Sequence, residues 1–114
     1  MRLLQLIILM VPAGLAGAAD RHWQLSAEQW ARPRNGIAVA DMAPLREAVD
    51  ALSAQPGSGL RIRYPGGEEG QLWAYELRAW LVTLGVPSAR QELQPGSGDA
   101  GRIELELVEE VDNE

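Results

Sequence analysis

The sequence of 114 residues contains no cysteine. This absence excludes disulfide bonds, a thiolate metal site, a cysteine nucleophile and a lipid-modified N-terminal cysteine. Lysine is absent as well, so all ten basic residues are arginine, which we attribute to the codon bias of a GC-rich bacterial genome. With His22 as the single histidine, a zinc site would need carboxylates for its other ligands, which zinc rarely accepts. We therefore expect neither a metal nor a cofactor.

Groups suited to catalysis are also scarce. A serine nucleophile needs a base and an orienting group, and the serines of this chain have no plausible histidine partner. The glycine-rich residues 66–70 lack the Gly-Lys-Ser/Thr ending of a phosphate-binding loop, so we interpret them as a turn in which glycine permits a positive φ. These absences predict that the protein is not an enzyme.

The first eighteen residues have the pattern of a secretory signal peptide. Arg2 precedes an apolar run over residues 3–11, and the small residues 16–18 suit a cleavage site. We expect cleavage after Ala18, with Ala19 as the second choice and an uncleaved anchor as the alternative. The apolar run is too short to span a bilayer, so no stable membrane insertion is expected after cleavage. The predicted location is the periplasm, with full secretion as the runner-up.

The charge balance argues against two classes of partner. Cleavage would leave nine arginines against sixteen acidic residues, a net charge of about −7 with the histidine neutral. Nucleic acids and anionic membrane surfaces both reward clustered positive charge. We therefore expect no nucleic-acid partner.

Hydrophobic periodicity predicts one α+β domain over residues 19–108, followed by an acidic tail over residues 109–114 that we expect to be disordered. Strict alternation predicts strands over residues 60–64 and 102–107, and a shorter strand is expected over residues 90–93.

The segment before the first helix is less regular. Residues 22–30 admit two interpretations, because the start alternates like a strand while residues 26–30 could begin a helical turn. We favour a strand over residues 23–28. A turn is predicted over residues 32–36, and a short extended segment over residues 37–40.

Two amphipathic helices are predicted. The first begins near residues 41–44, with Asp41 as its N-cap and Pro44 in its first turn, and ends at the Gly/Pro-rich residues 55–59. The second follows the glycine turn, and Gly85 ends it by taking the left-handed position. Its apolar stripe consists of Trp73, Leu77, Trp80, Leu81 and Leu84. The order predicts a small mixed sheet of three to four strands with two helices on one face.

Three segments of the chain share a pattern with a known family. They are residues 44–63, a helix leading into a strand; Leu77-Arg78-Ala79-Trp80-Leu81-Val82 within the second helix; and residues 85–105, a turn, a glycine loop and a strand. Together they resemble the OmpA-like C-terminal domain, a periplasmic peptidoglycan-binding module with a βαβαβ arrangement. The resemblance spans about residues 45–107. It implies that fold, and binding of a peptidoglycan peptide.

The binding motif of that family is only partly present. Members of the family that bind the diaminopimelate of peptidoglycan have a Thr-Asp pair after the second strand and a glycine three residues beyond the Asp. Counting back from Arg78 places Arg63 at the Asp position, whereas Gly66 matches the glycine. A cation there would repel the ammonium of the ligand. The resemblance therefore implies only Arg78 as a ligand-binding residue. Its planar guanidinium would bind a carboxylate of the ligand.

One candidate binding site surrounds the glycine turn. Arg61 and Arg63 share the outward face of the strand over residues 60–64, and we expect them, with Gly66 and Arg78, to recognise a zwitterionic cell-wall fragment or a charged segment of a partner. The alternative is an ordinary solvated sheet face with weak arginine–glutamate pairs.

A second candidate is the segment that contains Trp30, Arg32 and Arg34. Trp30 is the tryptophan most expected to be exposed, and an exposed indole there would mark an interface. The sequence thus predicts a non-enzymatic, exported binding module of the bacterial cell envelope that docks a protein partner. Peptidoglycan binding of the OmpA-like type is the alternative.

Overall fold

The computed structural model describes residues 21–32 and 34–111, and the expected signal peptide lies outside them. The strands are β1 (His22–Ser26), β2 (Gly59–Tyr64), β3 (Gln91–Pro95) and β4 (Arg102–Val108). The helices are α2 (Ala27–Trp30), α3 (Gly36–Ala40), α4 (Ala43–Ala54) and α5 (Glu68–Thr83), and a 3-10 turn, η1 (Ser88–Arg90), precedes β3. The predicted α+β class is confirmed.

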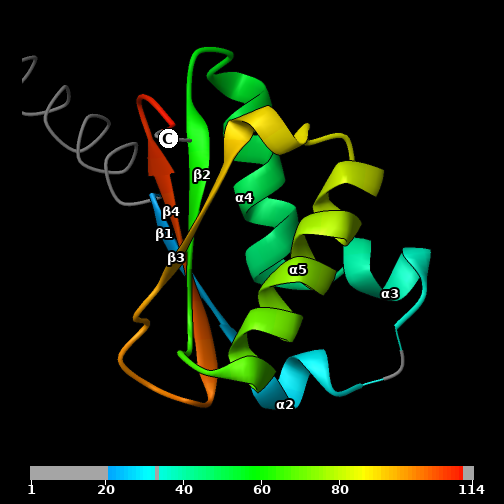
Figure 1. Cartoon of the computed structure of the whole chain (residues 1–114). Helices are drawn as coiled ribbons and strands as arrows, with labels where there is room; N and C mark the ends of the chain where they lie inside the picture. Colours follow the sequence, from blue (N-terminus) through cyan, green and yellow to red (C-terminus); the bar gives the residue numbers. More distant parts are fainter. Residues whose placement is uncertain (1–20, 33, 112–114) are drawn as a thin grey trace, which may run out of the picture.

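The four strands form one mixed sheet in the order β1-β4-β2-β3. β4 pairs antiparallel with both β1 and β2, whereas β2 and β3 are parallel. Figure 1 shows the helices of residues 21–111 together on one side of this sheet, and none of these helices covers its other face. The simple βαβαβ order is not confirmed, because three helices separate β1 from β2 and a fourth strand follows β3.

The core lies between the sheet and the helices, and strand alternation determines its membership. On the central strand, Leu60 and Ile62 are fully buried, while Arg61 and Arg63 point to the opposite face. The other strands supply Trp23, Leu25, Ile103, Leu105 and Leu107, and the longer helices supply Leu45, Ala48, Leu52, Trp73, Leu77 and Leu81. One face of the sheet is therefore apolar and covered, and the other is polar.

Local capping explains why the strand and helix interpretations of residues 22–30 are both right in part. β1 ends at Ser26, whose hydroxyl accepts a hydrogen bond from the backbone N–H of Gln29 at 3.0 Å. The side chain of Gln29 accepts one from the backbone N–H of Ser26 at 3.2 Å, which completes a capping box. The strand predicted over residues 23–28 therefore stops two residues early, and α2 begins.

The extended segment predicted over residues 37–40 is wrong, because these residues belong to α3. The side chain of Asn35 accepts a hydrogen bond from the backbone N–H of Ala38 at 2.9 Å, and this cap starts the helix. The backbone N–H of Asp41 then donates to the carbonyl of Ile37, so Asp41 ends α3 instead of capping α4. Met42 occupies the N-cap of α4 without a side-chain bond, and Pro44 lies in the first turn as predicted.

The end of α5 agrees with its prediction. Gly85 has a φ of 104°, and the backbone N–H of Val86 donates to the carbonyl of Leu81 at 2.9 Å. Val86 is only 3% exposed, so it supplies the apolar contact that accompanies such a cap. Within the predicted stripe, Trp73, Leu77 and Leu81 are buried, whereas Trp80 and Leu84 are half-buried.

Arg90 connects η1 to the end of α4. Its guanidinium donates to the carbonyls of Leu52, Gln55 and Ser58 at 3.0, 3.1 and 2.8 Å. The carbonyls at a helix C-terminus have no partners within the helix, so a cation there satisfies them and favours the helix dipole. The strand predicted over residues 90–93 consequently begins one residue later, at Gln91.

Gly66, in the turn before α5, and Gly70, in the first turn of α5, should differ in their tolerance of a side chain. A Cβ at Gly70 would overlap the carbonyl of Pro65, whereas a Cβ at Gly66 would meet no atom within 4 Å. We expect Gly70→Ala to lower the free energy of unfolding by about 3 kcal/mol, despite about 1 kcal/mol of gained helix propensity. Gly66→Ala should change it by less than about 0.5 kcal/mol. Urea unfolding of both variants measures this contrast, and equal stabilities would contradict the close packing of Gly70.

Trp73 and Trp80 test which face of α5 is buried. Trp73 is 8% exposed inside the core, while Trp80 is half-buried at its margin. Trp73→Ala should cost about 3–5 kcal/mol of unfolding free energy. Trp80→Ala should cost about half as much, because less apolar surface leaves contact with the core. Urea unfolding monitored by circular dichroism compares the two, and a larger loss for Trp80 would mean that the helix is rotated.

Candidate functional site

The face of the sheet that no helix of the described residues covers is a polar surface assembled from all four strands. Alternation places every second side chain of each strand on it. We call this surface the open face; its residues are His22 and Gln24 from β1, Arg61 and Arg63 from β2, Glu92 and Gln94 from β3, and Arg102, Glu104 and Glu106 from β4. Cations and carboxylates alternate across the strands, so their pairing decides which groups are free to bind.

Arg61 is fully engaged with its cross-strand neighbours. The register places it between Glu92 on β3 and Glu106 on β4. Its Nε donates to Glu92 Oε2 at 2.7 Å, and its Nη1 donates to Glu106 Oε1 at 3.4 Å. Glu92 is only 5% exposed, so Arg61 provides a cation to a buried carboxylate. The hydrogen bond to Glu92 raises the pKa of Arg61, with a smaller contribution from Glu106, so its charge persists at any working pH.

Arg102 engages the next carboxylate along β4. Its Nε donates to Glu104 Oε2 at 3.1 Å, and its Nη1 pairs with Asp99 Oδ2 at 3.1 Å. On the other side, His22 Nε2 lies 4.0 Å from Glu106 Oε2. The carboxylates of Glu104 and Glu106 thus both have partners that come from residues other than Arg63.

Arg63 differs from Arg61 although both lie on the same face of β2. Its register neighbours are Glu104 on β4 and Gln94 on β3. Glu104 is held by Arg102, and the amide of Gln94 donates to Glu92 at 3.1 Å. Within the described part of the chain, no carboxylate lies within 4.0 Å of the Arg63 guanidinium, and its buried Nε has no hydrogen-bond acceptor.

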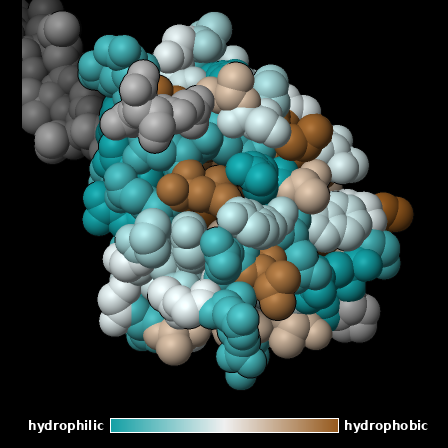
Figure 2. Space-filling model, viewed as in Figure 1, coloured by the Kyte–Doolittle hydropathy of each residue, from teal (hydrophilic) through white to brown (hydrophobic). Residues whose placement is uncertain are grey.

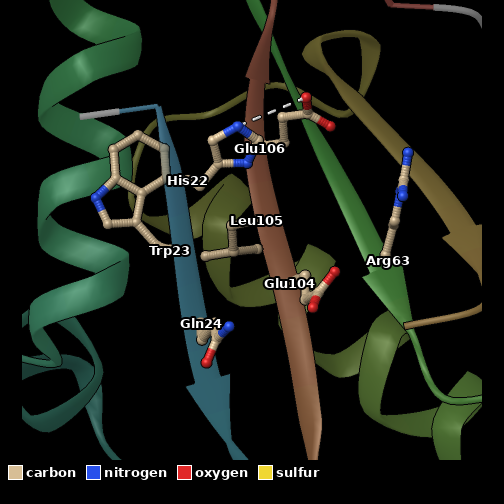
Figure 3. A pocket seen from close by; sticks show the side chains of 7 residues that line it. All are labelled: His22, Trp23, Gln24, Arg63, Glu104, Leu105 and Glu106. Carbon is tan, nitrogen blue, oxygen red and sulfur yellow. Dashed lines mark ion pairs between the residues drawn. The ribbon is translucent and has the colours of Figure 1, made fainter. Parts of the chain in front are cut away.

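Arg63 also borders a hollow in the open face. This hollow has a volume of about 250 Å³, and Figure 3 shows the side chains that line it: His22, Trp23, Gln24, Arg63, Glu104, Leu105 and Glu106. They come from three strands, so the site does not exist in any single segment. The polar groups of the hollow are the guanidinium of Arg63, the imidazole of His22 and the amide of Gln24. The carboxylates of Glu104 and Glu106, which are already bonded to other residues, lie beside them.

The structure does not bring the other residues of the first predicted site to this hollow. Gly66 is exposed in the turn before α5, and Arg78 is exposed on α5 with its guanidinium 5.3 Å from the ring of Tyr75. Arg78 lies ten positions after Glu68, the first residue of α5. At the rise of an α-helix, the two residues are therefore about 15 Å apart along the helix axis. Arg78 and the glycine turn therefore do not form one site with Arg61 and Arg63.

The second predicted site is corrected at Trp30, which is not exposed. The indole is only 6% exposed, and the guanidinium of Arg34 lies 4.7 Å from its ring centre. Arg34 also donates to the Trp30 carbonyl and pairs with Glu76 of α5 at 3.7 Å. Trp30 is therefore a core residue that Arg34 covers from outside, and both Arg32 and Arg34 lie on the surface.

Sequence reasoning missed the residues that complete the open face. Glu92, Gln24 and His22 were not candidates, although alternation along β1 already places the last two on one face. The signal for the pairing is the register between strands, which a single sequence does not contain.

Comparison with known proteins adds no family: no protein-family model and no curated protein sequence matches this chain. Residues 21–32 and 34–111 contain no cluster of three or more histidine, aspartate or glutamate side chains that could hold a metal ion. In the same residues, no helix has the length and apolar character needed to cross a membrane.

The two arginines of β2 should contribute differently to stability. Arg61→Met would leave the buried Glu92 carboxylate without its cation, and we expect a loss of about 2–3 kcal/mol in unfolding free energy. Arg63→Met removes no ion pair found in the described residues and takes away a buried donor without an acceptor, so we expect no loss and a gain of about 1–3 kcal/mol. Urea unfolding at neutral pH measures both, and equal losses would show that Arg63 is as firmly paired as Arg61.

Proposed function

We propose that the protein is a non-enzymatic, exported binding module of the bacterial cell envelope, and that a protein partner docks on its open face. The observation that most supports this is Arg63, which has no ion-pair partner among residues 21–32 and 34–111 and lies beside a hollow on the face that no helix of these residues covers. The expected signal peptide supports the envelope location. The lack of a nucleophile with a base and an orienting group supports binding in place of catalysis.

The size of the open face favours a segment of a partner over a broad interface. Four strands about 4.8 Å apart and about 20 Å long cover roughly 400 Å². A stable complex buries about 800 Å² on each partner. The open face alone therefore matches a short peptide segment or a weak, transient contact.

The helix side of the molecule is a weaker candidate. Among the described residues, its large exposed apolar side chains are those of Ile37, Leu72, Tyr75 and Val82. In the view of Figure 2, hydrophobic residues form small separate patches within a mostly hydrophilic surface. Scattered apolar residues of this kind are normal on a monomer and do not define a docking site.

Site-specific photo-crosslinking in the source bacterium tests the proposal. The full chain is produced with a photoreactive amino acid either at Gln24 on the open face or at Glu47 on the exposed side of α4. We expect a protein adduct in the periplasmic fraction from position 24 that is absent from position 47. Arg63→Gln should abolish this adduct, while Arg46→Gln, a matched change on α4, should leave it unchanged.

The same proteins distinguish the peptidoglycan alternative. Purified sacculi that retain the full chain, with retention lost in Arg78→Ala but not in Arg63→Gln, would overturn docking on the open face. Adducts that form equally from positions 24 and 47, or only in the cytoplasm, would also contradict the proposal.

A further inference from the structure

We propose that the hollow at Arg63 is a binding site for a single carboxylate group of a peptide. This inference rests on the proposed function, because it names the chemical group through which a partner would engage the open face. It begins from the contrast between two arginines two residues apart on one strand, of which one binds two carboxylates and the other binds none in the described residues.

The first argument is that Arg63 lacks an acceptor for a structural reason. Its two cross-strand neighbours form hydrogen bonds with other residues. Glu104 accepts one from Arg102 at 3.1 Å, and the amide of Gln94 donates one to Glu92 at 3.1 Å. A buried donor without an acceptor costs about 1–3 kcal/mol, and more when it belongs to a charged group. A ligand that supplies the acceptor would recover this free energy on binding.

The second argument concerns the shape and charge of the ligand. A guanidinium presents parallel N–H donors in a planar fork that matches a carboxylate. Glu104 and Glu106 also line the hollow, and their charges would repel a doubly charged phosphate more strongly than a singly charged carboxylate. The side chains of Gln24 and His22 offer further donors at the opposite side of the hollow.

The third argument is size. A hollow of about 250 Å³ is smaller than the pockets of about 300–1,000 Å³ that enclose whole small molecules. It suits one terminal group or one side chain of a longer segment that continues across the open face. The carboxylate could belong to a peptide C-terminus or to an aspartate or glutamate side chain, and these two sources share the chemistry that Arg63 recognises.

Nuclear magnetic resonance of the side-chain Nε–H groups of the full chain tests the inference. The probes are N-acetylglycine, which has a terminal carboxylate; N-acetylaspartic acid α-amide, which has a side-chain carboxylate; N-acetylglycinamide, which has neither; and inorganic phosphate. We expect the Arg63 signal to shift saturably with one or both carboxylates and not with the amide. The Arg61 signal, whose proton is already bonded to Glu92, should not move.

Matched variants and the competing probe define the outcomes. Arg63→Gln should abolish the response of neighbouring backbone amides, and Arg46→Gln should preserve it. A response to N-acetylglycine alone identifies a peptide C-terminus, and a response to the aspartate probe alone identifies a side chain. No response to either carboxylate, an equal response to the amide, or a stronger response to phosphate would overturn the inference.

Failure of this inference is distinguishable from failure of the proposed function. If the Gln24 crosslink depends on Arg63 while no carboxylate probe binds, the open face docks its partner by other contacts. If the crosslink is also absent, both proposals are wrong. A free-state spectrum in which the Arg63 Nε–H shows a hydrogen bond to Glu104 would remove the premise of the carboxylate site.

Discussion

The alternation of side chains along β2 is the constraint on which the rest of the structure depends. β2 lies inside the sheet, paired with β4 on one side and β3 on the other. The side chains on one of its faces are buried under the helices, and those on the other face belong to the open face. Leu60 and Ile62 are fully buried under the helices, and burial of such side chains supplies about 1.5–3 kcal/mol each. The same register forces Arg61 and Arg63 onto the opposite face, where they meet the glutamates of β3 and β4.

Pairing on the open face separates structural charges from binding charges. Arg61 has a nearly buried carboxylate beside it and is held by two partners, so it fixes β2 between its neighbours. Arg63 occupies an equivalent position two residues later, but the glutamate of β3 is replaced there by Gln94. Gln94 on β3 offers no carboxylate, and Glu104 on β4 is bonded to Arg102, so Arg63 is available to a ligand.

Local sequence signals were reliable where a short-range cap or a strict period determined the outcome. The strands around Ile62 and Leu105 and the end of α5 at Gly85 follow from patterns of a few residues. The failures lie between residues 27 and 41, where an extended segment was predicted over residues 37–40. There the side chain of Asn35 starts a helix, and Val39 gains full burial against the core. Trp30 was misplaced because Arg34 covers it, a contact set by chain folding.

The sequence by itself determined the α+β class, the faces of β2 and β4, and the scarcity of catalytic groups, because periodicity and composition need no knowledge of neighbours. Only the tertiary structure decided that β4 inserts between β1 and β2, and that among the described residues Arg61 has carboxylate partners while Arg63 has none. It also separated Arg78 from both arginines of β2 by placing them on different layers. The physical reason is that strand order and register bring together residues up to about eighty positions apart, such as Gln24 and Glu104.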